Sequence, residues 1–290
     1  MKKILITGAG SYVGGSVERY LQSWPEQYLV DTLDMKDRGW KNHSFRGYDA
    51  VLHVAGIVHM EKAKHDPAMA DLYDRVNHRL AVETAEKARE DGVKQFVFMS
   101  SCSVYGLTAP VGKVVTITKD TPLKPVDHYG RSKAAAEAGL QALAGETFSV
   151  AILRPPIIYG KSCKGNYVTM AKLAKKLPLF PYVNNQRSML YMDNLSELIR
   201  LIVDSGEGGI FCPQNNEYTN TSEMVAMIAK ANGKHIVQLK GFGWALKLLS
   251  RVTPMVDKAF GSLCYDRQIS GYPQNYCVTT LEESVIATEH

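Results

Sequence analysis

The sequence contains few cysteines, and no two of them are closely spaced. Its 290 residues include five: Cys102, Cys163, Cys212, Cys264 and Cys277. Disulfide frameworks and cysteine-rich zinc sites use paired or closely spaced cysteines, so an odd and scattered set argues against both. We therefore predict reduced thiols and a cytoplasmic protein.

Long hydrophobic runs are also missing. No stretch approaches the roughly 20 apolar residues that a membrane-spanning helix needs. The N-terminus leads directly into a strand pattern, without a cleavable apolar segment before it. These features predict a soluble protein with no integral membrane segment.

The sequence has no large excess of charge and no obvious cluster of metal ligands. Its 34 basic and 29 acidic residues leave a net charge of +5 that is spread along the chain, so we expect no nucleic-acid partner. His53, His59 and His65 lie six residues apart, without the spacing of three or four that places two ligands on one helix face. We expect no metal site.

The first half of the chain alternates strand-like runs with helical patterns. The runs are Ile4–Thr7, Tyr28–Leu33, Ala50–Val54, Gln95–Ser100 and Ser149–Leu153. Strands separated by helices indicate an α/β fold with a doubly wound parallel sheet. One of the intervening helices is expected to begin near Asp66 and to end at Gly92.

After Pro155 the pattern changes to loops that contain proline and asparagine. We predict a main domain over residues 1–155, joined by part of residues 190–230, and a smaller, partly interleaved lobe over residues 156–290. Residues 241–252, GFGWALKLLSRV, are basic and amphipathic, which is typical of a membrane-surface helix or of a helix packed on the lobe. The interruption at Pro254 favours packing.

The stretch TGAGSYVG, residues 7–14, joins the first strand to the first helix. Glycines between a strand and a helix let backbone N–H groups approach a pyrophosphate, and the helix N-terminus adds favourable partial charge. Gly8, Gly10 and Gly14 occupy this turn, but Val13 stands where a G-x-G-x-x-G pattern needs its last glycine. The turn is therefore either a damaged nucleotide site or a phosphate-binding turn with a different spacing.

An acidic residue follows the second strand, about 20 positions beyond the turn. Asp34 is placed to bind the ribose diol of an adenosine, and it would repel a 2′-phosphate. This favours NAD over NADP. Lys36 and Arg38 lie close enough in sequence to offset the repulsion, so NADP remains possible.

The segment YGRSK places Tyr129 and Lys133 four residues apart, on one face of a helix. A tyrosine is a poor base at neutral pH, but a nearby ammonium stabilises the phenolate and lowers the pKa. Only Tyr129 among the 15 tyrosines has a lysine four residues later. Ser100 and Ser101 end the fourth strand, at an edge of the sheet where ligands bind.

These elements, in this order, resemble the extended short-chain dehydrogenase/reductases, specifically the NAD-dependent epimerase/dehydratase family that acts on nucleotide-sugars. The motifs that carry the resemblance are TGAGSYVG, DAVLHVAG, RVN, SSCSVYG, YGRSK and LRPPIIYG. The family's turn reads T-G-x-x-G-x-x-G, and Ser11 replaces its middle glycine. The resemblance implies a Rossmann-like NAD(P)-binding domain and a smaller C-terminal substrate-binding lobe.

The resemblance also implies a role for individual residues. Tyr129 would be the catalytic acid/base, Lys133 would bind the nicotinamide ribose and lower the pKa of the tyrosine, and Ser101 would contact the substrate hydroxyl. The expected cofactor-binding residues are Gly8, Gly10, Ser11, Tyr12, Val13, Gly14, Asp34, Ala55, Asn77 and Lys133. The expected substrate-binding residues are Ser101, Tyr129, Asn166 and Arg187.

Several activities share these residues. A 4,6-dehydratase needs an Asp-Glu pair after the catalytic Ser/Thr. Cys102 and Ser103 stand there instead, which argues against dehydration. A UDP-glucose or UDP-N-acetylhexosamine 4-epimerase is favoured. A 4-keto-nucleotide-sugar reductase stays open, because Ile157 stands where epimerases often have asparagine, and a non-catalytic dinucleotide-binding protein is a third interpretation. The resemblance further implies a homodimer, formed by the helices that begin near Asp66 and Tyr129.

Overall fold

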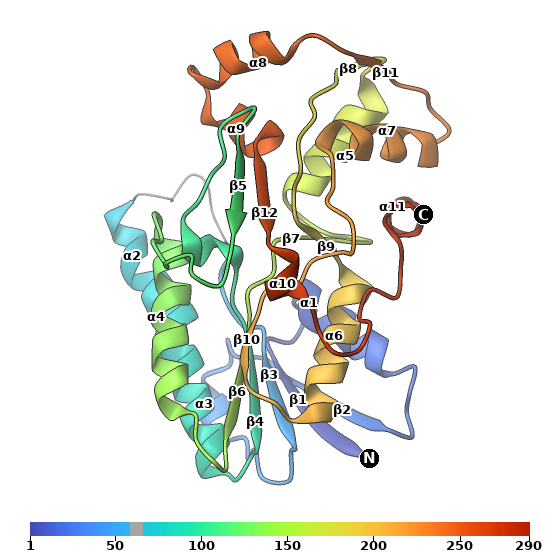
Figure 1. Cartoon of the computed structure of the whole chain (residues 1–290). Coiled ribbons are helices and arrows are strands. Elements are labelled where there is room, and N and C mark those ends of the chain that lie inside the picture. Colours follow the sequence, from blue (N-terminus) through green and yellow to red (C-terminus); the bar gives the residue numbers. More distant parts are fainter. Residues whose placement is uncertain (59–65) are drawn as a thin grey trace. The chain divides into compact units, whose positions relative to one another are not determined.

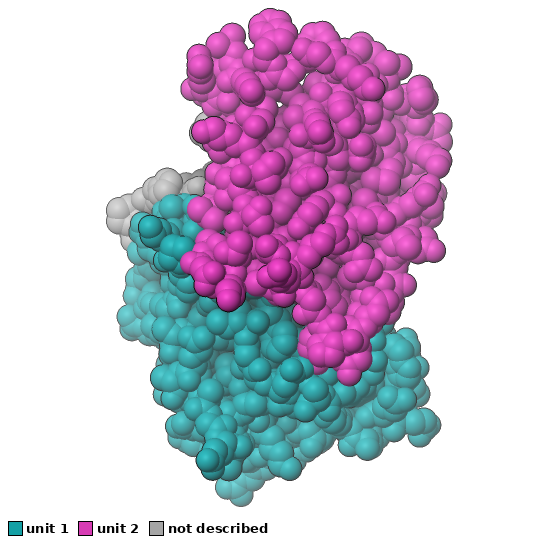
Figure 2. Space-filling view, viewed as in Figure 1, with its two compact units in different colours: residues 1–106, 122–155, 195–212 teal, residues 107–121, 156–194, 213–290 magenta. Residues whose placement is uncertain are grey.

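The computed structural model describes residues 1–58 and 66–290, and these residues form two compact units (Figure 2). Unit 1 consists of Met1–Gly106, Pro122–Pro155 and Leu195–Cys212. Unit 2 consists of Leu107–Thr121, Pro156–Asn194 and Pro213–His290. The sequence interpretation differs for residues 107–121, which it assigned to the main domain but which pack in unit 2.

Unit 1 is built on a six-stranded sheet in which every pair of neighbouring strands is parallel (Figure 1). The strands are β1 (Lys2–Thr7), β2 (Tyr28–Leu33), β3 (Ala50–His53), β4 (Gln95–Met99), β6 (Ser149–Leu153) and β10 (Gly209–Phe211). Their order is β10-β6-β4-β3-β1-β2. This confirms the predicted α/β fold, and it adds β10, which the sequence analysis missed.

The strand order places a topological switch at β1. The chain leaves β1 for β2 on one side and then returns to β3 on the other side, with Ile6 of β1 opposite Leu52 of β3. Ligands of doubly wound sheets bind beyond the carboxyl ends of the strands at such a switch. The turn after β1 and the loop after β3 therefore form the expected binding edge.

Helices cover both faces of this sheet (Figure 1). They are α1 (Tyr12–Leu21), α2 (Pro67–Tyr73), a π-helical segment η3 (Asp74–Arg79), α3 (Leu80–Glu90), α4 (His128–Leu143) and α6 (Met192–Ser205). The first three residues of α6 belong to unit 2. Short 3₁₀ helices are η1 (Arg38–Asn42) and η4 (Cys102–Tyr105). Ala81, Ala85 and Ala136 pack against Phe96 and Phe98 of β4, because small side chains let α3 and α4 approach the sheet closely.

Unit 2 contains three pairs of short parallel strands. They are β5 (Val114–Ile117) with β12 (Ser262–Tyr265), β7 (Ile157–Tyr159) with β9 (Met189–Tyr191), and β8 (Leu179–Pro181) with β11 (Val237–Leu239). Its helices are α5 (Asn166–Lys176), α7 (Thr221–Ala231), α8 (Gly243–Ser250), α9 (Pro254–Phe260), α10 (Arg267–Ser270) and α11 (Leu281–Glu289). The rings of Tyr159 and Tyr167 stack 5.3 Å apart in its core.

Two findings concern membranes. Across the described residues, no helix combines the length and the apolar character needed to cross a bilayer. In residues 241–252, where packing on the lobe was predicted, helix α8 faces the rest of unit 2 with the half-buried Ala245 and Leu246, and none of its residues is fully buried.

Candidate active site

The glycine turn after β1 has the geometry of a phosphate-binding loop. Gly8 and Gly10 have positive φ angles of 105° and 72°, which only glycine adopts without strain. Ser11 caps α1, since its hydroxyl accepts a hydrogen bond from the backbone N–H of Gly14 at 3.1 Å. The replacement of the family's middle glycine therefore supplies a helix cap.

Close contacts explain two of the three glycines. A Cβ on Gly8 would lie 2.7 Å from the backbone nitrogen of Ala55, in the loop after β3, and a Cβ on Gly14 would lie 2.7 Å from the Ser11 hydroxyl oxygen. A Cβ on Gly10 would meet no atom within 4 Å, so the chain faces open space there. Tyr12 and Val13 begin α1 beside this space. A tight turn at a helix N-terminus with open space in front of it fits a dinucleotide pyrophosphate.

Replacing Gly8 with alanine is expected to weaken NAD binding at least tenfold. The added methyl group would strain the left-handed backbone, at a cost of about 1–2 kcal/mol, and would push the turn away from Ala55. Titration of NAD by calorimetry measures the affinity. Gly15→Ala is the control, because Gly15 lies within α1 with open space around its Cβ; unchanged affinity of Gly8→Ala would contradict the assignment.

Asp34 follows β2 and is exposed at the same edge of the sheet. Its carboxylate accepts a hydrogen bond from the backbone N–H of Lys36 at 2.9 Å. The backbone N–H groups of Gly8 and Ala9 both donate to the carbonyl of Leu33, which ties the end of β2 to the glycine turn. Asp34 is therefore held next to the turn, as a ribose-binding carboxylate requires.

Tyr129 lies in the first turn of α4, close to η4. Asp127 caps α4 by accepting from the Gly130 N–H at 2.8 Å, and a Cβ on Gly130 would lie 2.6 Å from the carbonyl oxygen of Ser103. Glycine at this position lets the helix approach η4 closely. As a result Ser101, the residue that caps η4, forms a hydrogen bond with Tyr129.

The expected lowering of the tyrosine pKa is not what the structure shows. Burial, with smaller contributions from Cys102, Asp127 and Tyr73, raises the pKa of Tyr129 to about 12, although the hydrogen bond with Ser101 lowers it. Desolvation disfavours the charged phenolate, and this effect outweighs the hydrogen bond. The protein alone therefore keeps Tyr129 protonated at neutral pH.

Lys133 is buried one turn further along α4. Its ammonium donates to the carbonyl of Met99 at 2.8 Å and lies 4.6 Å from the centre of the Phe98 ring. Burial lowers the pKa of Lys133 to about 8, although the Glu137 carboxylate favours the charged form. The lysine is thus anchored at the end of β4, close to Gly56 in the loop after β3.

A buried charged network lies beyond Lys133 and was missed by the sequence analysis. Arg154 donates to both carboxylate oxygens of Glu137, at 2.6–3.1 Å, and to the Tyr105 hydroxyl at 2.8 Å. Ser100 also donates to Glu137. The hydroxyl of Ser100 is therefore engaged by this network, whereas that of Ser101 lies beside Tyr129. The sequence signal that could have indicated this network is Glu137, which lies four residues after Lys133 in the pattern Y-x-x-x-K-x-x-x-E.

Asn77 links the loop after β3 to α4. Its side chain accepts from the N–H of Ile57 at 2.8 Å, donates to the carbonyl of Ile57 at 3.0 Å, and donates to the Ser132 hydroxyl at 3.2 Å. Ser132 in turn donates to the carbonyl of Tyr129. Asn77 lies in η3, and π-helical turns often mark functional positions. These contacts make it a support for the helix that carries Tyr129.

His53 ends β3 and is completely buried beside Lys133. Its Nδ1 lies 2.8 Å from the Thr7 hydroxyl oxygen, and its ring stacks on Phe96 and Phe98. Burial and, to a smaller extent, the charge of Lys133 together lower the pKa of His53 from 6.5 to about 3. Between these values the unfolded chain binds a proton that the folded protein does not, so stability falls as the pH is lowered.

This linkage predicts acid sensitivity at one residue. From pH 7 to pH 5 the protonation of His53 in the unfolded chain should remove about 2 kcal/mol of stability. Urea denaturation at both pH values should show a smaller loss for His53→Gln, whose side chain does not titrate. An equal loss in the two proteins would contradict the shift. The comparison uses the difference between pH values, so any constant cost of the substitution cancels.

The two predicted substrate-binding residues outside unit 1 lie in unit 2. Asn166 is the first residue of α5 and is exposed. Arg187 is partly buried, and its guanidinium donates to the backbone carbonyls of Lys258 and Gly261 at the end of α9. The roles of both residues in binding substrate remain predictions.

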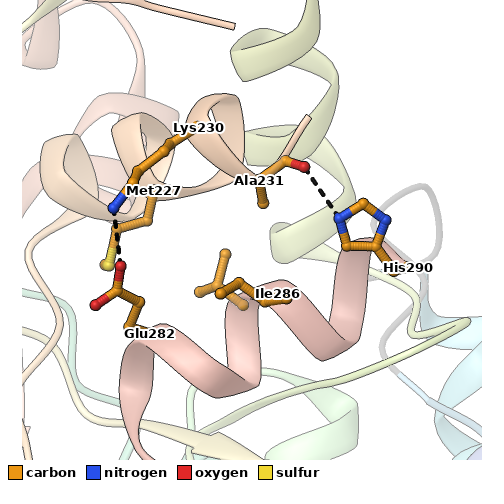
Figure 3. Close-up of a pocket in the computed structure, with 7 residues that line it drawn as sticks. Met227, Lys230, Ala231, Glu282, Ile286 and His290 are labelled. Carbon is orange, nitrogen blue, oxygen red and sulfur yellow. Dashed lines mark hydrogen bonds and ion pairs between the residues drawn. The ribbon is translucent and has the colours of Figure 1, made fainter. Parts of the chain in front are cut away.

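Unit 2 also contains a cavity of 240 Å³ between α7 and α11 (Figure 3). Lys230 and Glu282 form an ion pair at its edge, with 3.0 Å between the ammonium and the carboxylate, and the His290 ring contacts the carbonyl of Ala231. None of the predicted site residues lines this cavity. The described residues contain no cluster of three possible metal ligands, and His59 and His65 lie outside them.

Comparisons with known proteins identify the family of the chain. Residues 4–211 match the model of the NAD dependent epimerase/dehydratase family. The chain belongs to this family. A UDP-glucose 4-epimerase from Vibrio cholerae is 31% identical over 91% of this chain and 87% of its own length. The family assignment makes the protein an NAD(P)-dependent enzyme of the extended short-chain dehydrogenase/reductase type.

Two solved structures share the fold of this chain. A dTDP-4-dehydrorhamnose reductase from Clostridium acetobutylicum superposes with a TM-score of 0.75 at 18% identity, covering 99% of this chain and 98% of its own. A UDP-glucuronic acid 4-epimerase from Bacillus cereus, solved in complex with NAD, gives a TM-score of 0.73 at 17% identity, with 98% and 96% covered. Both support the Rossmann-like architecture of the family member described here.

Proposed function

We propose that the protein is an NAD-dependent nucleotide-sugar 4-epimerase that acts on UDP-glucose or a UDP-N-acetylhexosamine. The observation that carries the proposal is the arrangement of Tyr129, Ser101 and Lys133 at the carboxyl edge of the sheet that also bears the glycine turn. The similarity to a UDP-glucose 4-epimerase supports this substrate class.

One group of residues in unit 1 would bind the cofactor, and a second group would transfer the proton. Gly8, Gly10 and Ser11, with the N–H groups at the start of α1, would hold the pyrophosphate, and Asp34 would bind the adenosine ribose. Lys133 would bind the second ribose. The exposed carboxylate of Asp34 favours NAD over NADP, because it would repel the 2′-phosphate of NADP. When bound, oxidised NAD supplies a hydride acceptor and a positive charge.

Tyr129 would take the proton of a sugar hydroxyl as the carbon that bears this hydroxyl is oxidised to a ketone. It would return the proton when the ketone is reduced from its opposite face. Ser101 would hold the same hydroxyl and stabilise the phenolate, in line with its effect on the pKa of Tyr129. Because burial disfavours the phenolate, the base depends on positive charge placed near it. Asn77 and Asp127 would keep the helix that carries Tyr129 in position.

A 4-keto-nucleotide-sugar reductase that uses NADH or NADPH is the second candidate. It has the same requirement for Tyr129, Lys133 and Ser101. The similarity of fold to a dTDP-4-dehydrorhamnose reductase, and Ile157 at a position where asparagine is common in epimerases, favour it. The two candidates differ in whether the cofactor stays bound between turnovers.

Cofactor retention separates the two candidates in one experiment. The purified protein is denatured, released NAD is quantified, and UDP-glucose and UDP-N-acetylglucosamine are offered to the native protein without added cofactor. Bound NAD with formation of the 4-epimer supports the epimerase. A site that releases no NAD, together with oxidation of added NADH or NADPH by a 4-keto sugar, contradicts it and supports the reductase.

We further propose that the enzyme is a cytoplasmic homodimer. The segments α2, η3 and α3 pack beside α4 in unit 1, and a second copy would add its own equivalent helices to them. Light scattering of the purified protein measures the mass directly. A mass near the 32.1 kDa of one chain would contradict the dimer.

A further inference from the structure

The segment 240–256, which contains α8, carries large apolar side chains that point to solvent. Phe242, Leu249 and Met255 are exposed, and Trp244, Leu248 and Val252 are 71%, 56% and 80% exposed. Exposed apolar residues gathered in one short segment indicate an interaction surface. We call residues 240–256 the α8 segment.

The geometry of α8 concentrates these side chains. Trp244 and Leu248 lie four residues apart and therefore share one face of the helix, and Val252 continues this row beyond its end. Ala245 and Leu246 line an apolar cavity of 260 Å³ with residues of β8 and β11, and they account for the packing of α8 on unit 2. Figure 1 shows this helix in orange, above α9.

The charge of this region has one sign. Between Glu223 and Asp257 the sequence contains no acidic residue. The basic residues in the same interval are Lys230, Lys234, Lys240, Lys247 and Arg251. Lys240, Lys247 and Arg251 are exposed, and no ion pair recorded within the described residues includes them. Apolar side chains are therefore flanked by cations that are available to an anionic partner.

We propose that the α8 segment docks the protein on an anionic lipid surface. Tryptophan and leucine can enter the boundary between headgroups and acyl chains, while lysine and arginine remain among the anionic headgroups. The arrangement of Trp244 and Leu248 beside Lys247 and Arg251 has this pattern. With 8 residues, α8 extends only about 12 Å, so it lies at the interface and does not cross the bilayer.

Two other occupants fit less well. In a two-fold contact between copies, each α8 segment would meet its own equivalent, which brings Lys247 and Arg251 close to identical charges. A protein partner needs a pocket that matches the protruding Trp244 and Val252, whereas fluid lipid adapts to them. The proposal concerns a surface in unit 2 and is independent of the sugar chemistry assigned to Tyr129.

Sedimentation with vesicles tests the proposal. The full-length protein should bind vesicles of 70% phosphatidylcholine and 30% phosphatidylglycerol, and should bind pure phosphatidylcholine much more weakly. Trp244→Ser with Leu248→Ser should lower the partition coefficient at least tenfold. Lys247→Gln with Arg251→Gln should lower it about fivefold for each residue.

The matched control is Val278→Ser with Lys119→Gln, which removes an apolar side chain of similar exposure (51%) and a cation elsewhere on unit 2. It should bind like the parent protein. Circular dichroism melting verifies that each variant folds. Equal binding of all variants, or no binding to the anionic vesicles, would overturn the proposal. Light scattering of the Trp244→Ser, Leu248→Ser variant provides a further check, since loss of a dimer would assign the segment to a second copy instead.

A second readout places the tryptophan itself. Lipids brominated on the acyl chain should quench the fluorescence of the bound protein, because Trp244 would lie within reach of the chains. In Trp244→Phe the quenching should disappear while binding to the vesicles persists. Persistent quenching in this variant would mean that Trp24 or Trp40 enters the lipid, and that the α8 segment is not the docking surface.

Discussion

Tyr129→Phe is expected to lower kcat roughly 10²–10⁴-fold, the contribution typical of a positioned general acid or base. Phenylalanine keeps the ring, including its edge contact with Tyr73 at 6.4 Å, and removes only the hydroxyl that bonds with Ser101. Conversion of the UDP-sugar, followed by chromatography of the two epimers, measures the loss. The substitution tests the atom that the mechanism requires.

The binding of cofactor should be retained in this variant. Asp34, the glycine turn and the Lys133 ammonium are untouched, so calorimetry should give the NAD affinity of the parent protein. Tyr182→Phe is the matched control, since its hydroxyl makes only a 3.4 Å contact with Glu223 at the surface of unit 2. Full activity of Tyr129→Phe on every candidate sugar would show that another group transfers the proton.

The sequence predicted the parts of the fold that local patterns encode. The five strand-like runs agree with β1, β2, β3, β4 and β6 to within two residues at each end. Strands β1, β3, β4 and β6 are mostly buried, and their β-branched runs are visible without knowledge of their partners. Strand β2 lies at the edge of the sheet and is largely half-buried or exposed. The glycine turn and the four-residue spacing of Tyr129 and Lys133 are local patterns as well. Their places in the fold could be predicted from the order of strands and helices along the sequence.

The missed features depend on distant parts of the chain. Strand β10 has only three residues, and it forms by pairing with β6 more than fifty residues earlier. Residues 107–121 join unit 2 because β5 pairs with β12, which is separated from it by over a hundred residues. No local pattern encodes such pairings.

The same limit applies to the electrostatics of the site. The four-residue spacing predicted that Lys133 lowers the pKa of Tyr129, but the extent of burial could not be read from the spacing, and burial dominates. The contact between Arg154 and Glu137 was also hidden. It joins the end of β6 to the middle of α4, and both residues would be expected on a surface if only their charge were considered.

Arg154→Met is expected to destabilise the protein by about 3–5 kcal/mol, because it leaves the Glu137 carboxylate buried without its charged partner. Both side chains are buried, and the guanidinium makes four hydrogen bonds in the network with Glu137 and Tyr105. Methionine has a similar length and apolar character, so little cavity forms. Urea denaturation at pH 7 measures the change in the free energy of unfolding.

A double variant separates the lost charge pair from the lost packing. In Arg154→Met with Glu137→Gln the acceptor is neutral, so most of the stability should return, since neutral replacements of a buried ion pair are often tolerated. Activity should recover less, because Ser100 donates to Glu137 and lies next to Ser101, and Glu137 lies one turn beyond Lys133. A single variant that loses less than about 1 kcal/mol would mean that the carboxylate is protonated or hydrated. The contact between Arg154 and Glu137 would then have no part in holding the end of β6 against α4.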